Sequence, residues 1–184
     1  TGEAFVGGLV GNAGFDYIVN SYASGSVTST GGGEAGSWAG GLLGSGFELA
    51  IEDSFAASSV TTADDPAFGG GLIGMMDQSV QLNNTYFNSA AGSGHCGYDQ
   101  YSANDYVDNE GCIAIDLADD PNYFFGNNVN APLDQWDFED VWQTNVDGYP
   151  TFIGQNQEPG IQCEEVTGTD TSVTISCIST PDTW

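Results

Sequence analysis

Residues 5–11 have the sequence FVGGLVG, and this stretch decides the fold because it recurs. Residues 38–44 are WAGGLLG and residues 68–74 are FGGGLIG, so the copies start 33 and then 30 residues apart. Self-similarity at such a period is typical of proteins built from stacked repeats. We therefore take about three repeats as the organising unit of the chain.

A second short segment follows each copy at a nearly fixed distance. It is IVNSY at residues 18–22, IEDSF at 51–55 and LNNTY at 82–86, where the third is shifted by one extra residue. A third segment, GSVT at 25–28 and SSVT at 58–61, completes the first two copies. None of these segments could bury its apolar side alone, whereas stacking would align them as parallel strands around a shared interior. The sequence therefore predicts an all-β fold, a parallel β-solenoid.

The large apolar side chains are expected to fill the solenoid interior in three successive layers. These are Phe5, Leu9, Ile18, Tyr22 and Val27, then Trp38, Leu42, Ile51, Phe55 and Val60, then Phe68, Leu72, Leu82 and Tyr86. The Gly-Gly pair of each copy is expected where the backbone turns sharply or approaches the next repeat too closely for a Cβ. The alternative is a β-sandwich whose strands resemble one another by chance.

The repeat is lost after residue 88, which divides the chain into three parts. The solenoid is expected over residues 1–88, a disulfide loop and closing segment over 89–154, and a tail over 155–184. Within the tail, residues 161–178 alternate apolar and polar side chains, which predicts a β-hairpin.

An aromatic-rich stretch at residues 133–153, which includes Trp136 and Trp142, is expected to cap the open end of the solenoid. Ahead of it, residues Ile115–Ala118 are expected to form a short helix that Pro121 helps to end.

The charge of the chain excludes several classes of partner. Its 184 residues include no Lys or Arg and 26 Asp plus Glu, a formal charge of −26. Binding to nucleic acid needs Lys or Arg, and an anionic membrane surface would be repelled. A composition that is 40% hydrophobic and 12% aromatic nevertheless fits a packed chain. No apolar stretch is long enough to insert across a membrane.

The four cysteines form two local pairs. Cys96 and Cys112 enclose 15 residues, and Cys163 and Cys177 enclose 13. Because there is no C-x-x-C pattern and a single His, two disulfides are favoured over a zinc site. Disulfides imply an oxidising, extracellular location. With no visible signal peptide and a start at Thr1, we expect a mature chain or a fragment of a longer one.

The repeat resembles the GLUG motif of bacterial and archaeal surface proteins. The resemblance rests on GGLVG at residues 7–11, on Asn20 to Ala23, on NTYFN at 84–88, and on residues 111–125 and 136–152. It thus covers roughly residues 5–153. It implies a β-helix fold and a place in cell-surface proteins, adhesins or non-catalytic parts of secreted peptidases.

A search for catalytic residues favours a non-enzymatic protein. His95 stands beside Cys96, but sequence neighbours rarely orient their side chains for catalysis, and Cys96 has an expected disulfide partner. Carboxylate pairs occur at Asp64-Asp65, Asp119-Asp120 and Glu139-Asp140. Such pairs serve polysaccharide hydrolases with β-helix folds. Glu52 and Asp53 correspond to Val19 and Asn20, however, so no column of acids recurs, and solvated surface acids are the simpler interpretation.

Calcium is the one candidate ion, and no cofactor is expected to be required. Asp105, Asp108 and Glu110 bring hard oxygen ligands together in one loop, without the EF-hand pattern. A second candidate group is Asp116, Asp119 and Asp120. Asn83 begins an N-x-T sequon and is a candidate glycosylation site.

These observations favour an extracellular structural protein that assembles into a surface filament or layer. The first repeat begins at residue 5, so an uncapped end could stack on another copy. The tail, 155–184, is expected to contact a neighbouring subunit. The alternatives are an adhesin module of a longer surface protein and a β-helix enzyme acting on carbohydrate.

Overall fold

The computed structural model of the chain describes residues 4–30, 37–62, 69–91, 94–99, 106–107, 110–146, 148–155, 161–166 and 174–179. For residues 91, 106–107, 161–166 and 174–179 it describes the backbone alone. Strands make up 51% of the structure, helix is almost absent, and several of the sheets are parallel. The predicted all-β class is confirmed.

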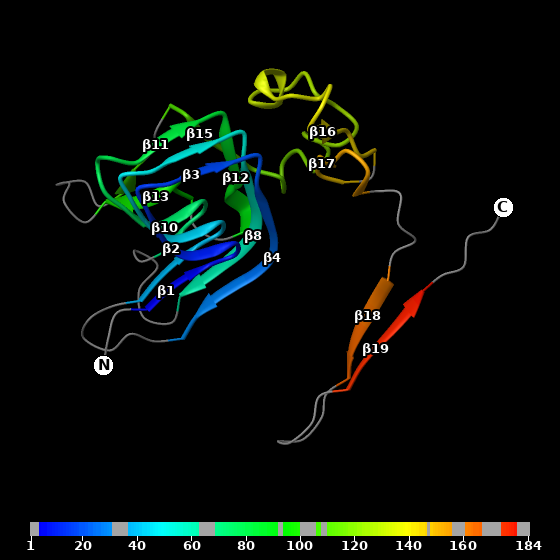
Figure 1. Ribbon diagram of the computed structural model, residues 1–184, viewed down its shortest axis with the longest axis horizontal. Coiled ribbons are helices and arrows are strands. Elements are labelled where there is room, and N and C mark those ends of the chain that lie inside the picture. Colours follow the sequence, from blue (N-terminus) through cyan, green and yellow to red (C-terminus); the bar gives the residue numbers. More distant parts are fainter. Residues whose placement is uncertain are drawn as a thin grey trace.

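Each repeat supplies four strands in the same order (Figure 1). The first repeat contains β1 (Ala4–Gly7), β2 (Val10–Gly14), β3 (Tyr17–Val19) and β4 (Tyr22–Ser29). The second contains β5 (Ser37–Gly40), β6 (Leu43–Phe47), β7 (Ala50–Glu52) and β8 (Phe55–Thr62). The third contains β9 (Gly69–Gly70), β10 (Ile73–Met76), β11 (Gln81–Asn83) and β12 (Thr85–Asn88).

Equivalent strands of successive repeats pair in parallel, in the orders β1-β5-β9, β2-β6-β10, β3-β7-β11 and β4-β8-β12. The register aligns Ile18 with Ile51 and Leu82, which confirms the predicted alignment, including the one-residue shift of the third copy. Pairing extends past residue 88. There β13 (Gly97–Asp99) joins β10 and carries an antiparallel β14 (Tyr106–Val107), while β15 (Cys112–Ile115) joins β12.

The Gly-Gly pairs lie where neighbouring repeats touch through their backbones. A Cβ on Gly40 would lie 2.0 Å from the Leu43 carbonyl oxygen and 2.3 Å from the Gly74 nitrogen. A Cβ on Gly7 would lie 2.5 Å from the Gly44 nitrogen. Real Cβ atoms do not approach so closely, so the close-approach explanation of this motif is confirmed.

The corner that precedes β4, β8 and β12 has the same backbone conformation in each repeat. Asn20, Asp53 and Asn84 occupy it with φ of 49°, 47° and 50°. Among non-glycine residues, Asn and Asp adopt this left-handed conformation most readily. The Asn84 side-chain amide also donates a hydrogen bond to Asp53 Oδ1 at 3.1 Å. The corners therefore stack as a column of Asn and Asp side chains.

The interior between the sheets is aliphatic, and one prediction about it is wrong. Its buried members include Ala23, Leu42, Ile51, Ala56, Leu72, Leu82 and Phe87. Tyr22, Phe55 and Tyr86 belong instead to a second cluster on the other side of β4, β8 and β12. Because strand side chains alternate between faces, Ala23, Ala56 and Phe87 take the inward positions. Of the other predicted layer residues, Leu9 is 48% exposed, and Phe68 lies outside the described residues.

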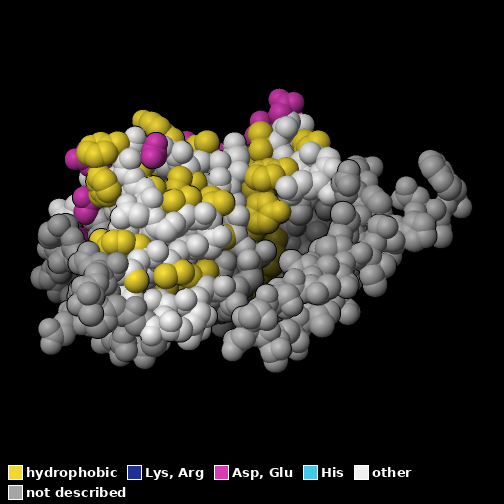
Figure 2. Space-filling view, turned by 60° about the horizontal axis from the view of Figure 1, so that its bottom comes forward, with side chains coloured by type: hydrophobic (Ala, Val, Ile, Leu, Met, Phe, Trp, Pro, Cys, Tyr) yellow, Lys and Arg dark blue, Asp and Glu magenta, His cyan; other side chains and the backbone are white. Residues whose placement is uncertain are grey.

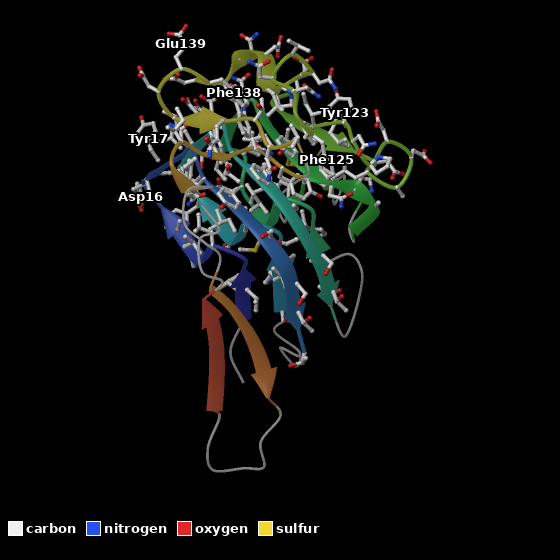
Figure 3. The ribbon with its side chains drawn as sticks, turned by 90° about the vertical axis from the view of Figure 1, so that its right-hand side faces the viewer. Asp16, Tyr17, Tyr123, Phe125, Phe138 and Glu139 are labelled. Carbon is white, nitrogen blue, oxygen red and sulfur yellow. A yellow bond between two sulfur atoms is a disulfide. The ribbon has the colours of Figure 1, made fainter. Side chains whose placement is uncertain are left out.

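The aromatic-rich segment covers the side of the repeats, which corrects the predicted end cap. It contains η4 (Leu133–Gln135) and an antiparallel pair, β16 (Trp142–Gln143) and β17 (Thr151–Phe152). Trp136 Nε1 donates to the Asn84 carbonyl at 2.8 Å, and Trp142 Nε1 donates to Asn20 Oδ1 at 3.0 Å. These contacts reach the third and the first repeat. Figure 3 shows Tyr123, Phe125 and Phe138 in the segment that crosses this side.

The short helix expected at Ile115–Ala118 is absent. Ile115 ends β15, and Asp116 Oδ1 accepts hydrogen bonds from the backbone nitrogens of Ala118 and Asp119 at 2.9 and 3.4 Å. An Asp that binds its own downstream backbone favours a turn over a helix. The one remaining 3-10 helix of the described residues, η3 (Ser89–Ala91), follows β12.

The predicted hairpin of the tail is present as an antiparallel pair. β18 (Ile161–Val166) pairs with β19 (Thr174–Ser179), and the register places Cys163 opposite Cys177. Among the residues that the structure describes, no helix is both long and apolar enough to cross a membrane.

Candidate functional site

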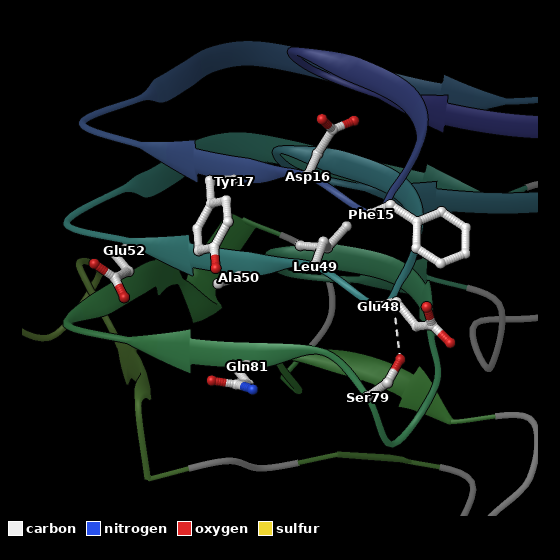
Figure 4. A pocket seen from close by; sticks show the side chains of 9 residues that line it. All are labelled: Phe15, Asp16, Tyr17, Glu48, Leu49, Ala50, Glu52, Ser79 and Gln81. Atoms are coloured by element: carbon white, nitrogen blue, oxygen red, sulfur yellow. Dashed lines mark hydrogen bonds between the residues drawn. The ribbon is translucent and has the colours of Figure 1, made fainter.

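A groove of about 570 Å³ lies on the outer side of β3, β7 and β11, at the corners where the chain enters these strands. We call it the outer groove (Figure 4). All three repeats contribute to it, and its lining residues are Phe15, Asp16, Tyr17, Glu48, Leu49, Ala50, Glu52, Ser79 and Gln81. Tyr17, Ala50 and Gln81 are in-register neighbours on the three strands.

Backbone geometry turns the groove side chains outward. Phe15 and Glu48 lie at equivalent corners with φ of 60° and 47°, a conformation that is uncommon for such residues. The third repeat has its extra residue at this corner. There the Glu48 backbone nitrogen donates to Ser79 Oγ at 2.6 Å, and Ser79 Oγ in turn donates to Asp77 Oδ1. The sequence irregularity therefore forms one end of the groove.

Two aromatic rings of the first repeat flank the groove floor. Tyr17 is 79% exposed and Phe15 is 73% exposed, whereas Leu49 between them is buried. Figure 4 shows the two rings on opposite sides of Leu49, with Tyr17 extending toward Ala50. Phe15 also contacts Phe47 edge-to-face, with ring centroids 5.2 Å apart. Large exposed aromatic surface on a folded protein is typical of an interaction site.

The polar groups of the groove are rich in hydrogen-bond acceptors. Asp16, Glu48 and Glu52 contribute carboxylates, and Gln81 contributes an amide. Just beyond them, the Asn83 amide donates to Glu52 Oε1 at 3.3 Å. Because the chain has no Lys or Arg, no such side chain offsets these acids, and anionic ligands are disfavoured. Figure 2 shows Asp and Glu side chains beside hydrophobic patches on one face of the described surface.

The calcium candidates receive no further support from the structure. Asp105 and Asp108 lie outside the described residues, and Glu110 is exposed. The second group, Asp116, Asp119 and Asp120, is exposed as well. Within the part of the chain that the structure describes, no three His, Cys, Asp or Glu side chains are grouped as metal ligands would be. Calcium binding therefore stays a prediction.

The predicted Cys96–Cys112 disulfide is present in the structure. It ties the segment after β12 to β15, next to the third repeat. For Cys163–Cys177 the strand register is compatible with a bond, but the side chains lie outside the described residues, so this disulfide stays a prediction.

Asn83, the candidate glycosylation site, is exposed at the end of β11. Thr85 of the same sequon is fully buried and donates to the Gly111 carbonyl at 2.8 Å. A sugar on Asn83 would therefore have to be attached before the chain folds. Glycosylation itself stays a prediction.

The residues considered for catalysis do not come together at the groove. His95 is partly buried, and its carbonyl accepts a hydrogen bond from the Gly71 nitrogen at 2.7 Å. Asp119-Asp120 and Glu139-Asp140 are exposed, and Asp64-Asp65 lies outside the described residues.

The outer groove is a site that sequence reasoning missed. The available signal was a break in the repeat: Phe15 and Tyr17 stand where the second repeat has Glu48 and Ala50. Neither Phe15 nor Tyr17 is among the predicted layer residues, and a single break in a repeat does not by itself indicate an outward-facing aromatic pair.

Comparison of the chain with protein-family models, with curated proteins and with solved structures finds no match.

Proposed function

We propose that the chain is a non-enzymatic, extracellular structural protein, a parallel β-solenoid of GLUG-type repeats that assembles with further copies. Four sets of parallel strands, each taken in order from three successive repeats, support the solenoid interpretation. The Gly-Gly contacts between repeats support it as well, because they recur at the same position of each layer.

The observation that carries the assembly proposal is the difference between equivalent leucines. Leu42 and Leu72 are fully buried, whereas Leu9 of the first repeat is 48% exposed. The three residues occupy the same place in the G-G-L-x-G motif. One further layer beyond the first repeat would bury Leu9, and at 25 cal/mol per Å² even part of a leucine side chain stabilises by about 1 kcal/mol.

The same end exposes strand edges. β1, β2, β3 and β4 are each the terminal strand of their sheet among the described strands. Unpaired strand edges are templates for pairing with another chain. A second copy is the occupant we propose, because β9 and β11 are terminal strands at the opposite end of two of these sheets, so one copy can place strand edges against those of the next. Such head-to-tail contacts build filaments when they do not close into a ring.

The tail is proposed to strengthen this contact. The hairpin of β18 and β19 lies outside the repeats in sequence, and a strand added to a sheet edge gains backbone hydrogen bonds. Deletion of residues 161–184 should then weaken assembly without lowering the melting temperature of the repeats.

Charge sets the conditions for assembly. Two chains of charge −26 repel each other, so we expect association only where salt or calcium screens the acids. An extracellular location accords with this requirement and with the Cys96–Cys112 disulfide.

Electron microscopy and sedimentation of the purified chain, in about 0.15 M NaCl with and without calcium, test the proposal. We expect head-to-tail oligomers that grow with protein concentration. Leu9→Asp should abolish them, whereas Val129→Asp, at a position that is 74% exposed outside the repeats, should not. A monomer under all these conditions, or assembly that Leu9→Asp leaves intact, would refute self-assembly.

The adhesin alternative makes a different prediction for the same end. A repeat preceding Thr1 in a longer chain would then cover Leu9, and the isolated chain would stay monomeric. Adding one further repeat before Thr1 should in that case raise the melting temperature and bury Leu9 without causing assembly.

A further inference from the structure

The exposed rings of the outer groove are not needed to build the stack. At the positions of Phe15 and Tyr17 the second repeat has Glu48 and Ala50, and its strands pair in the same way. The two rings are nevertheless 73% and 79% exposed. Aromatic rings carry the largest hydrophobic surface of any side chains, so a ligand that covers them gains substantially.

The groove floor and rim differ in chemistry. Leu49 and Ala50 form a buried apolar floor, and the rings stand on either side of it (Figure 4). Around them, Asp16, Glu48 and Glu52 offer acceptors. A fitting ligand must therefore present an apolar face to the rings and many hydroxyl donors to the rim. A pyranose ring has this combination, with C–H groups on its faces and hydroxyls at its edges.

Shape indicates a polymer. The groove is open to solvent and crosses three strands, which lie about 4.8 Å apart, so it extends about 10 Å along the stack. Its volume of about 570 Å³ lies within the usual range for small-ligand sites. The open sides would allow a chain to continue beyond it.

We propose that the outer groove binds a segment of an uncharged glycan chain, with Tyr17 and Phe15 stacking on sugar rings and the carboxylates accepting from hydroxyls. Polyanionic glycans are excluded by the acids of the groove and by the overall charge. A peptide that binds by strand addition would pair with the edge of β3 or β11 rather than lie across the three strands, so the groove itself is not a site of that kind.

Native affinity electrophoresis of the full chain tests this proposal. The probes are gels that contain hydroxyethylcellulose, galactomannan or soluble chitin fragments, with alginate as the polyanion. We expect at least one uncharged polysaccharide to retard the protein and alginate to leave it unaffected. Tyr17→Ala should raise the dissociation constant about tenfold, whereas Tyr17→Phe should retain binding because the ring remains.

Two further variants make the test specific. Phe15→Asn removes the second ring and should weaken binding similarly. Asn readily adopts the left-handed backbone conformation of this corner. Val129→Ala changes an equally exposed apolar side chain elsewhere and should have no effect.

Three results would overturn the proposal. They are no retardation by any uncharged probe, retardation that survives loss of both rings, and groove-dependent binding of a Lys-rich peptide alone in a parallel calorimetric titration.

Discussion

Two neighbouring faces of the repeats carry aromatic side chains, and only one of these faces is covered. On β4, β8 and β12, Tyr22, Phe55 and Tyr86 stack with ring centroids 5.0 and 4.9 Å apart, beneath Trp136 and Trp142. On the β3 side, the aromatic side chains are exposed. Figure 3 shows Asp16 and Tyr17 at the left-hand margin of the view.

The difference between the faces lies in how the aromatic residues recur. The covered position is aromatic in all three repeats, so every layer adds a ring to the same column. Tyr17, by contrast, is followed by Ala50 and Gln81 at its position. A side chain that recurs at each layer serves the stack, whereas one that occurs once is free to serve a ligand. We therefore assign the covered face to stability and the open face to binding.

Trp142→Ala removes a central side chain of the covered face and should lower the free energy of unfolding more than the other substitutions proposed. Trp142 is fully buried, contacts Tyr22 and Phe55, and donates to Asn20. Truncating such a side chain should lower the free energy of unfolding by about 3–5 kcal/mol, measured by chemical denaturation.

Tyr17→Ala is the matched change on the open face and should alter stability by less than about 0.5 kcal/mol. If the two substitutions destabilised the protein equally, the assignment of the faces would be wrong.

Much of the covered face could be derived from the sequence, but its position could not. The repeat fixed the register of Tyr22, Phe55 and Tyr86, because identical spacing means identical layers. Which side of the strands these rings occupy depends on Ala23, Ala56 and Phe87, whose inward orientation is set by where the chain turns. A one-residue change of phase exchanges the two faces, and apolar residues stand at both positions.

The position of the closing segment could not be predicted from the sequence, for a related reason. Its aromatic composition predicts burial, but a stack of repeats offers two places for burial, the end and the side. Hydrogen bonds from Trp136 and Trp142 to the corner residues hold the segment against the side of the repeats. The outer groove was harder still, since it depends on a corner conformation at Phe15 and Glu48 that no Gly, Asn or Asp marks.

Tyr86→Phe should stabilise the covered column of rings. Tyr86 is fully buried, and its hydroxyl has no hydrogen-bond partner among the described residues. Burial raises the pKa of the Tyr86 phenol well above its usual value, so the group stays neutral. Removing an unsatisfied hydroxyl should raise the free energy of unfolding by about 1 kcal/mol, as Phe55 at the equivalent position suggests.

Tyr22→Phe is the control in the same column. Tyr22 donates to Gln155 Oε1 at 3.1 Å, so its loss should give a small destabilisation of about 0.5 kcal/mol. Changes of opposite sign for the two substitutions are the expected pattern. Destabilisation by Tyr86→Phe would show that the hydroxyl is satisfied in solution.

The smallest effect is expected at the corner between the two faces, where Asp53 stands between Asn20 and Asn84. Burial raises the pKa of the Asp53 carboxyl, an effect that the Asn84 hydrogen bond opposes and that Glu52 and Asp137 reinforce. A carboxyl with a raised pKa favours the folded state most when protonated, so its contribution is complete below the unfolded value of about 3.8 and is lost as the pH rises through the folded value. Asp53→Asn, which keeps a residue suited to the left-handed corner, should therefore stabilise the protein at neutral pH by only about 0.3 kcal/mol, since the carboxyl is only partly buried and solvent screens it. The gain should vanish at pH values below the pKa of the unfolded carboxyl.

Glu52→Gln removes one charge from the adjacent outward position and serves as the control for net charge. Thermal unfolding of the three proteins across this pH range measures the difference. A gain that is independent of pH, or that Glu52→Gln reproduces in full, would assign the effect to net charge rather than to burial of the corner column.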